Sequence, residues 1–447
     1  MIFNDKDQEF EKGIKKWNRP NIIIIVVDAF RPKNLSLFGY EKETDKNLKR
    51  VIKESILFKK FFSSSNATAP SLMSIFTGKY PNNHGIIHQF PYTSNEEIEK
   101  MDKELKFWLP TYLKEKGYET IAIDWIGLWF KEGFDYYKEK EEKQNKTKRI
   151  MNIPFIKKML LSLPAWAYRF GKKISKTRAS VNFTPAEETM NLAISKINIS
   201  KKPFFLFTHF WDTHFPFPTI KYKGSKKDDV NEMLKKIKET SQREYVKKRI
   251  ADINLSSIED ITKKYDSAIR EVDKQIGKLF DFLRKQKLWE NTLFIVLGDH
   301  GTSLTEHEVY FTSSSLYDET IHVPFIIHIP GVKNKEIKNF AQNIDIAPTI
   351  LDILNETNSH EFDGKSMIEL IRKGEKIRDK ILAFDGLGED IKTVRTDEKK
   401  LILAKNPRCN LCKAEHHEKI EEYNLKDDPN EEKNIYSGNS ELMKFLE

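Results

Sequence analysis

The stretch Asn21-Ile-Ile-Ile-Ile-Val-Val27, followed directly by Asp28, decides the fold. Seven almost wholly apolar and strongly β-branched residues predict a strand that is buried on both faces. Similar apolar runs recur at residues 120–123, 204–207, 293–297 and 325–329. Between two of them, Lys264–Leu283 carries apolar residues at helical spacing. Alternating strands and helices predict an α/β fold, with a large mostly parallel sheet sandwiched by helices.

Composition narrows the class of protein. Of 447 residues, 39% are hydrophobic and 32% charged, which excludes wholesale disorder. The chain has 76 Lys and Arg against 67 Asp and Glu, so its net charge of +9 does not call for a nucleic-acid partner, and we expect none. Two cysteines exclude a disulfide-built scaffold. No signal-peptide or membrane-spanning pattern is visible, so we expect a cytoplasmic protein.

Two inserts interrupt the α/β pattern, at about residues 138–180 and 220–250. Within the first, the apolar, aromatic and basic segment 150–173 could contact a membrane peripherally, or simply pack over the domain. The second is basic and helix-prone, and predicts a solvated excursion. We therefore divide the chain into an N-terminal extension (1–18), a large α/β domain (19–374) and a C-terminal α+β subdomain with a small antiparallel sheet (375–447), in which 392–404 predicts a hairpin.

Acidic side chains follow two of the predicted strands at the same point. Asp28 comes directly after the first strand, and Asp299 with His300 follows the strand at 293–297. Ligands of open α/β sheets gather beyond the carboxyl ends of the strands, and carboxylates there are candidate ligands of a divalent ion. Either aspartate alone could be a helix N-cap. The matched positions of the pair favour a metal site.

A hydroxyl between these two strands is a candidate nucleophile. In Asn66–Gly78, Pro70 suits a first helical turn and Gly78 a helix end, so Thr68 should lie just before a helix N-terminus. Free N–H groups and the helix dipole favour an anion there. A hydroxyl that touches a metal could become an alkoxide nucleophile, although a threonine in this place could equally be a plain N-cap.

Two histidines, His209 and His214, follow a third apolar strand. A histidine near a developing anion can hold the substrate or protonate the leaving oxygen. The alternative is a structural histidine among aromatic residues.

The motifs occur in an order that resembles the sulfatase family of the alkaline phosphatase superfamily. The matching segments cover most of residues 19–436, and the main ones are Asn21–Arg31, Thr68–Ser71, Phe76–Pro81, Asp212–Pro216, Gly298–Gly301, Asp345–Thr349 and Tyr423–Pro429. Each motif is weak alone, but this many in the right order are very specific. The resemblance implies the family's fold and assigns His214 as the active-site histidine.

The departures from the family pattern bear on the reaction. Active sulfatases carry a Cys or Ser in C/S-x-P-x-R that is converted to formylglycine, whereas this chain has Thr68 and, at the Arg position, Leu72. We expect no formylglycine. The second aspartate of the family's usual pair is Ala29, the family's Lys and His are absent from residues 124–128, and a third expected Lys is Thr312. These losses remove several cations that would hold a sulfate group.

What remains resembles the threonine-nucleophile branch of the superfamily. That resemblance implies one divalent ion (Mn, Mg, Ca or Zn) on Asp28, Thr68, Asp299 and His300, with Thr68 and His214 as catalytic residues. Further candidates for substrate binding are His84, His307, Asn66 and Arg31, and either of these histidines could instead complete a second metal site.

The function we expect is a metal-dependent hydrolase or transferase of sulfate or phosphate esters that works through a covalent Thr68 intermediate, with phosphoryl chemistry slightly favoured. The substrate would be an anionic ester, such as one of a saccharide or lipid headgroup. One alternative is a true sulfuric ester hydrolase of the arylsulfatase kind. Another is an inactive, sulfatase-shaped binder of an anion or carbohydrate.

Cys409-Asn-Leu-Cys412, with His416 and His417 nearby, could be a zinc clip. A structural zinc site needs four ligands, and adjacent histidines rarely both point at one ion. The sequence alone therefore favours a pair of free or loosely bridged thiols.

Overall fold

The computed structural model describes residues 19–446 apart from 125, 139–183, 226–228, 357–359 and 389. The predictions for the N-terminal extension and for segment 150–173 lie outside these residues. Within the described part of the chain, no helix has both the length and the apolar character needed to cross a membrane.

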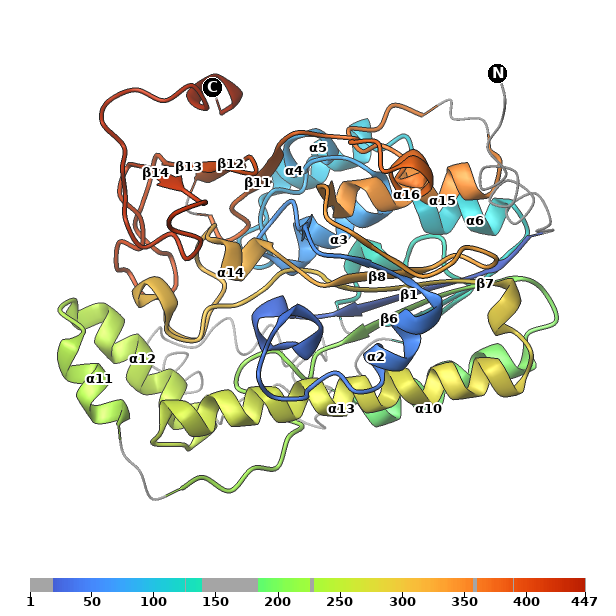
Figure 1. Cartoon of the computed structure of the whole chain (residues 1–447), viewed down its shortest axis with the longest axis horizontal. Helices are drawn as coiled ribbons and strands as arrows, with labels where there is room; N and C mark the ends of the chain where they lie inside the picture. Colours follow the sequence, from blue (N-terminus) through green and yellow to red (C-terminus); the bar gives the residue numbers. More distant parts are fainter. Residues whose placement is uncertain are drawn as a thin grey trace, which may run out of the picture.

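An eight-stranded, mostly parallel sheet forms the centre of the molecule (Figure 1). The order is β5 (Tyr136–Lys138), β4 (Glu119–Ile123), β6 (Phe204–Phe210), β1 (Asn21–Val27), β7 (Thr292–Gly298), β8 (Phe325–His328), β2 (Ile56–Phe58) and β9 (Lys335–Ile337). The first five strands in this order, from β5 through β4, β6 and β1 to β7, run parallel to one another, whereas β8 runs antiparallel to both of its neighbours. The predicted fold class is confirmed, and every predicted apolar run is a strand.

Helices cover both faces of this sheet, as the burial of β1 requires. Ile23 and Ile25 point to the face covered by α10 (Ala186–Ile199) and α13 (Ile258–Lys285). Ile22 and Ile24 point to the opposite face. The helices on that side include α3 (Thr68–Thr77), α6 (Leu109–Glu115), α15 (Ile346–Ile353) and α16 (Ile368–Lys373). Further helices are α2 (Leu48–Val51), α4 (Pro81–His84), α5 (Asn95–Glu104) and α14 (Asp318–Ile321).

The second insert is not a solvated excursion, so that expectation is wrong. It forms α11 (Val230–Lys236) and α12 (Thr240–Ile253), which join the core on the α13 side. The apolar side chains Val230, Met233 and Val246 are buried there. Its many lysines and arginines dominate the composition and conceal a narrow apolar stripe at helical spacing.

The C-terminal segment forms a separate four-stranded antiparallel sheet. Its strands are β11 (Ile381–Phe384), β12 (Ile391–Arg395), β13 (Lys399–Ala404) and β14 (Ile420–Asn424), in sequence order. The hairpin predicted at 392–404 is β12 and β13. The domain boundary at residue 375 stays a prediction.

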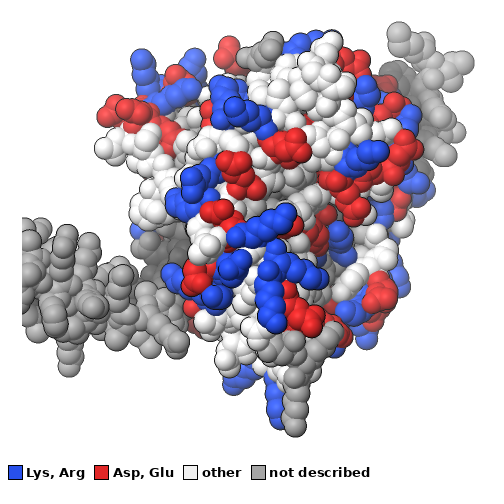
Figure 2. Space-filling view, turned by 90° about the vertical axis from the view of Figure 1, so that its left-hand side faces the viewer, with Lys and Arg blue, Asp and Glu red and all other residues white. Residues whose placement is uncertain are grey.

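Charged side chains of both signs lie next to one another on the face shown in Figure 2. The positive net charge of +9 is therefore not gathered into one continuous area on that face.

Candidate functional site

Three neighbouring strands bring the key side chains together at their carboxyl ends. Asp28 follows β1, Asp299 follows β7, and His209 is the last residue but one of β6. Because β6, β1 and β7 are adjacent and parallel, these side chains meet at one edge of the sheet. All three are buried.

The two carboxylates are arranged for a cation. Neither oxygen of Asp28, nor Oδ2 of Asp299, has a hydrogen-bond partner of ordinary geometry among the described residues. Burial and the neighbouring Asp299 raise the pKa of Asp28 well above its ordinary value, and the nearby Thr68 hydroxyl offsets this only in part. Ligand atoms of Asp28, Asp299 and His300 lie within 4.8 Å of one another. Buried carboxylate oxygens that accept no hydrogen bond are suited to bind a divalent ion.

His300 presents a fixed nitrogen to this group. Its Nδ1 lies 2.7 Å from the carbonyl oxygen of Gly301, and since a carbonyl only accepts, Nδ1 carries the proton. The unprotonated Nε2 then faces Asp299 Oδ2 at 3.6 Å. A histidine held in this way is a typical metal ligand.

Thr68 is the first residue of α3 rather than the residue before it, which corrects the sequence-based position. The N-cap of this helix is Ala67, so the plain N-cap interpretation of Thr68 does not hold. Instead Oγ1 lies 3.2 Å from His300 Nε2, to which it donates. The predicted end of the helix at Gly78, in the left-handed conformation (φ +68°), is confirmed.

The N-terminus of α3 offers fewer free N–H groups than expected. The Ala69 N–H donates to the side chain of Gln89 at 2.6 Å, Pro70 has none, and the Ser71 N–H donates to the Ala67 carbonyl. The expectation of free N–H groups for an anion is therefore wrong for residues 69–71. What the helix still offers an anion is its dipole.

His209 forms a contact that the sequence did not reveal. Its Nδ1 lies 2.9 Å from a carboxylate oxygen of Asp124, whose other oxygen accepts a hydrogen bond from the Tyr137 hydroxyl. His209 Nε2 therefore points to Asp299 Oδ2, at 3.8 Å. Asp124 follows β4 as Asp28 follows β1, and this shared position was the available signal.

A cleft of about 380 Å³ opens over these residues. Thr68, His300 and His214 lie in it, and aromatic side chains form much of its wall: Trp211, Phe215, Tyr245 and Phe311. Burial, helped by the nearby positive charge of Arg249, lowers the pKa of His214 to about 3. At neutral pH His214 is therefore a neutral hydrogen-bonding group in the substrate-free protein.

Arg249 of α12 is the second residue that sequence reasoning missed. Its half-buried guanidinium lies over the Phe215 ring, 4.3 Å from the centroid, and donates to the Phe311 carbonyl. Its Nε has no partner among the described residues, and the side chain lines the cleft. Arg249 was hidden in the basic run of an insert interpreted as solvated. It brings a cation to a site that lacks the family's lysines.

The four further candidates do not line the cleft. Arg31 is paired with Glu306 at 2.8 Å, and His84 with the Ser74 hydroxyl at 3.2 Å. His307 stacks on Tyr317 with ring centroids 3.7 Å apart. Asn66 donates to the carbonyls of Ser313 and Ser315 and accepts from the Gly386 N–H, so it holds loops around the site together.

Comparison with known proteins assigns the family. The family model described as Sulfatase matches residues 20–356. The chain belongs to the sulfatase family. A second model, N-sulphoglucosamine sulphohydrolase, C-terminal, matches residues 305–446. The chain is thus an enzyme of the alkaline phosphatase superfamily, and the matching sulfatase-family proteins are ester hydrolases. The sulfatase family generally uses a divalent metal.

Individual relatives agree with this assignment. The arylsulfatase of Clostridium perfringens is 26% identical over 412 residues, covering 83% of this chain and 82% of the relative. The N-acetylglucosamine-6-O-sulfatase of Bacteroides thetaiotaomicron is 24% identical, with 79% and 71% covered.

Solved structures share the fold. The phosphonate monoester hydrolase of Agrobacterium radiobacter superposes with a TM-score of 0.66 at 18% identity, covering 96% of this chain and 93% of that one. A protein in complex with its substrate D-glucosamine-2-N,6-O-disulfate gives the same TM-score and identity, with 96% and 95% covered.

Proposed function

We propose that this chain is a metal-dependent hydrolase or transferase of sulfate or phosphate esters, with Thr68 as the covalent nucleophile. The observation that carries the proposal is the place of the Thr68 hydroxyl. It lies at the first residue of a buried helix, bonded to His300 and beside carboxylate oxygens of Asp28 and Asp299 that accept no hydrogen bond of ordinary geometry among the described residues.

Asp28, Asp299, His300 and Thr68 would hold one divalent ion, and His209 faces the same group from the other side. A divalent ion bound there would favour the ionised form of the Thr68 oxygen and neutralise charge on the ester. The Asp124 carboxylate keeps His209 oriented toward this site through Nδ1.

The protein's own groups account for the rest of a two-step transfer. In the first step Thr68 Oγ1 gives up its proton and bonds to phosphorus or sulfur, while the bond to the ester oxygen breaks and the alcohol leaves protonated. Arg249 pairs with the non-bridging oxygens, and neutral His214 donates a hydrogen bond to an oxygen of the ester. In the second step water or an acceptor alcohol displaces Thr68 and restores its hydroxyl.

Two observations point to different substrates, one to phosphate esters and the other to sulfate esters. Thr68 stands where active sulfatases carry the formylglycine precursor, which favours phosphoryl transfer. The names of the relatives favour sulfate esters, among them esters of saccharides. A mixed aromatic and polar cleft of about 380 Å³ suits a sugar-sized or aryl-sized group. We propose phosphoryl chemistry first, with sulfuric ester hydrolysis as the alternative.

A substrate panel tests the proposal. The protein is stripped of metal, restored with Mn²⁺, Mg²⁺, Ca²⁺ or Zn²⁺, and offered an aryl sulfate, a phosphomonoester and a phosphodiester. We expect metal-dependent turnover that is greatest on a phosphate ester and falls by about 10³-fold or more in Thr68→Ala. Thr77→Ala is the matched control, since that buried threonine of α3 bonds only backbone groups at the far end of the helix, the Met73 carbonyl and the Lys79 N–H. Best turnover on the sulfate, with Thr68→Ala unchanged, would contradict the proposal.

A further inference from the structure

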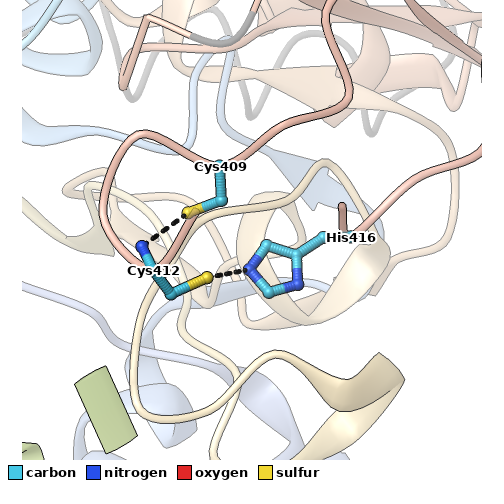
Figure 3. A group of neighbouring side chains, drawn as sticks. All are labelled: Cys409, Cys412 and His416. Carbon is cyan, nitrogen blue, oxygen red and sulfur yellow. Dashed lines mark hydrogen bonds between the residues drawn. The ribbon is translucent and has the colours of Figure 1, made fainter. Parts of the chain in front are cut away.

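A second group of metal-binding side chains lies outside the catalytic residues, in the loop between β13 and β14. Cys409, Cys412 and His416 point toward one another (Figure 3), and their ligand atoms lie within 4.8 Å of one another. Cys412 Sγ is 3.0 Å from His416 Nε2. All three side chains are buried. The structure therefore adds a histidine to the two thiols that the sequence alone favoured.

The backbone of the loop is folded around the sulfur of Cys409. The N–H groups of Leu411 and Cys412 donate to Cys409 Sγ at 3.3 Å and 3.4 Å. The turn is closed by hydrogen bonds from Lys413 N–H to the Cys409 carbonyl and from Cys409 N–H to the Ala414 carbonyl. Two N–H donors aimed at one sulfur stabilise negative charge on it, as a metal-bound thiolate requires.

Other roles for the two thiols fit less well. The sulfurs are not joined in a disulfide. Reactive cysteines are partly exposed, whereas Cys409 and Cys412 are 0% and 2% exposed. A buried histidine nitrogen beside two sulfurs adds nothing to the packing of an apolar cluster, whereas the three atoms together form a set of ligands that suits a soft metal ion.

We propose that Cys409, Cys412 and His416 bind a thiophilic divalent metal ion, for which zinc is the best fit. Binding displaces the two thiol protons to solvent and leaves two thiolates and one neutral imidazole on the ion. A three-residue set of this kind leaves one position of a tetrahedral ion for a water molecule or small ligand. The soft sulfur ligands distinguish this site from the oxygen-rich group at the carboxyl ends of β1 and β7.

The metal would fix one wall of the catalytic cleft. Leu411, between the two cysteines, lines the cleft, and Tyr245 of α12 both lines it and packs against the cysteine pair. Asn410 donates to the carbonyls of Leu387 and Gly388, and Leu387 is a further cleft residue. The loop thus ties α12, which carries Arg249, to the C-terminal sheet.

Cobalt substitution of the full-length protein tests the site without using activity. The protein is stripped of metal under reducing conditions and reloaded with Co²⁺. We expect the thiolate-to-cobalt charge-transfer absorption in the near ultraviolet, which a site of oxygen and nitrogen ligands does not give. Asp299→Asn should keep this band, whereas Cys409→Ser, Cys412→Ser and His416→Ala should lose or strongly weaken it. His417→Gln is the matched control, because that neighbouring histidine is bonded to Glu421 instead.

Metal and thiol counts on the wild-type protein keep the test decisive even if a variant fails to fold. Protein purified from zinc-supplemented medium should hold zinc that two equivalents of a thiol reagent release, and unfolding in chelator should expose two thiols. Absence of the cobalt–thiolate band in the wild-type protein would overturn the proposal. So would a Cys409–Cys412 disulfide found on unfolding without reductant.

Discussion

At the scale of single residues, the proposed metal site depends on three buried carboxylate oxygens, both of Asp28 and Oδ2 of Asp299, that accept no hydrogen bond of ordinary geometry among the described residues. The matched strand ends in the sequence were enough to select Asp28, Asp299 and His300, because carboxyl ends of parallel strands share one edge. The place of Asp124 after β4 offered the same signal, but which residue its carboxylate would bond, here His209, was not predictable. Local sequence carries no record of such a pairing.

Replacing one of these carboxylates should stabilise the metal-free protein. The pKa of Asp28 is raised in the fold above its ordinary value of 3.8, so its ionisation costs stability as pH rises through the folded pKa. Asp28→Asn removes this cost. We therefore expect metal-free Asp28→Asn to melt a few degrees higher than wild type at neutral pH, in thermal unfolding followed by circular dichroism.

The same experiment has two internal controls. The difference in melting temperature should close as pH falls below 3.8, where Asp28 is protonated in both the folded and the unfolded state. Adding a divalent ion should reverse the order, because the ion stabilises the wild-type protein more than the variant. A variant that is less stable than wild type without metal at neutral pH would argue against a cation site at Asp28.

At the scale of elements, apolar runs predicted the strands well because a fully buried strand must be apolar on both sides. The same reasoning failed for α12. Its buried positions are few, spaced one and then two turns apart (Gln242, Val246 and Ile253), so its charged surface dominates the local composition. That error hid a candidate site residue, since α12 supplies Arg249 to the cleft.

The contribution of α12 to substrate binding can be measured by removing the positive charge of Arg249. Arg249→Ala should raise KM for an anionic ester by about 10- to 100-fold, the effect expected from losing a charge-assisted hydrogen bond. Lys247→Ala is the control, because Lys247 lies on the same helix but pairs with Glu244 at the surface. Equal effects of the two substitutions on KM would show that Arg249 does not contact the substrate.

At the scale of the whole molecule, the order of motifs predicted the family, but the coupling of the two sheets was not visible in sequence. Phe62 and Tyr317 of the large domain share one apolar cluster with Ile381 and Ile402 of the C-terminal sheet. Asn66, two residues before Thr68, also accepts a hydrogen bond from Gly386. The C-terminal sheet and the loop after β11 therefore help to support the segment that leads into Thr68.

This shared core predicts cooperative unfolding. Differential scanning calorimetry of the full chain should show a single transition with calorimetric and van't Hoff enthalpies that agree. Two separate transitions, one of which leaves metal-dependent turnover intact, would mean that the C-terminal sheet folds independently of the site.

The most direct test of the central claim is to trap the covalent intermediate. Metal-restored protein is mixed with the ester that it turns over best, quenched in acid during turnover, digested and mapped by high-resolution mass spectrometry, which separates a phosphoryl from a sulfuryl adduct. The account predicts an adduct on Thr68 in the wild-type protein, phosphoryl by our proposal, and none in Thr68→Ala. Turnover of that ester by Thr68→Ala at the wild-type rate, with no adduct on Thr68 in the wild-type protein, would contradict it.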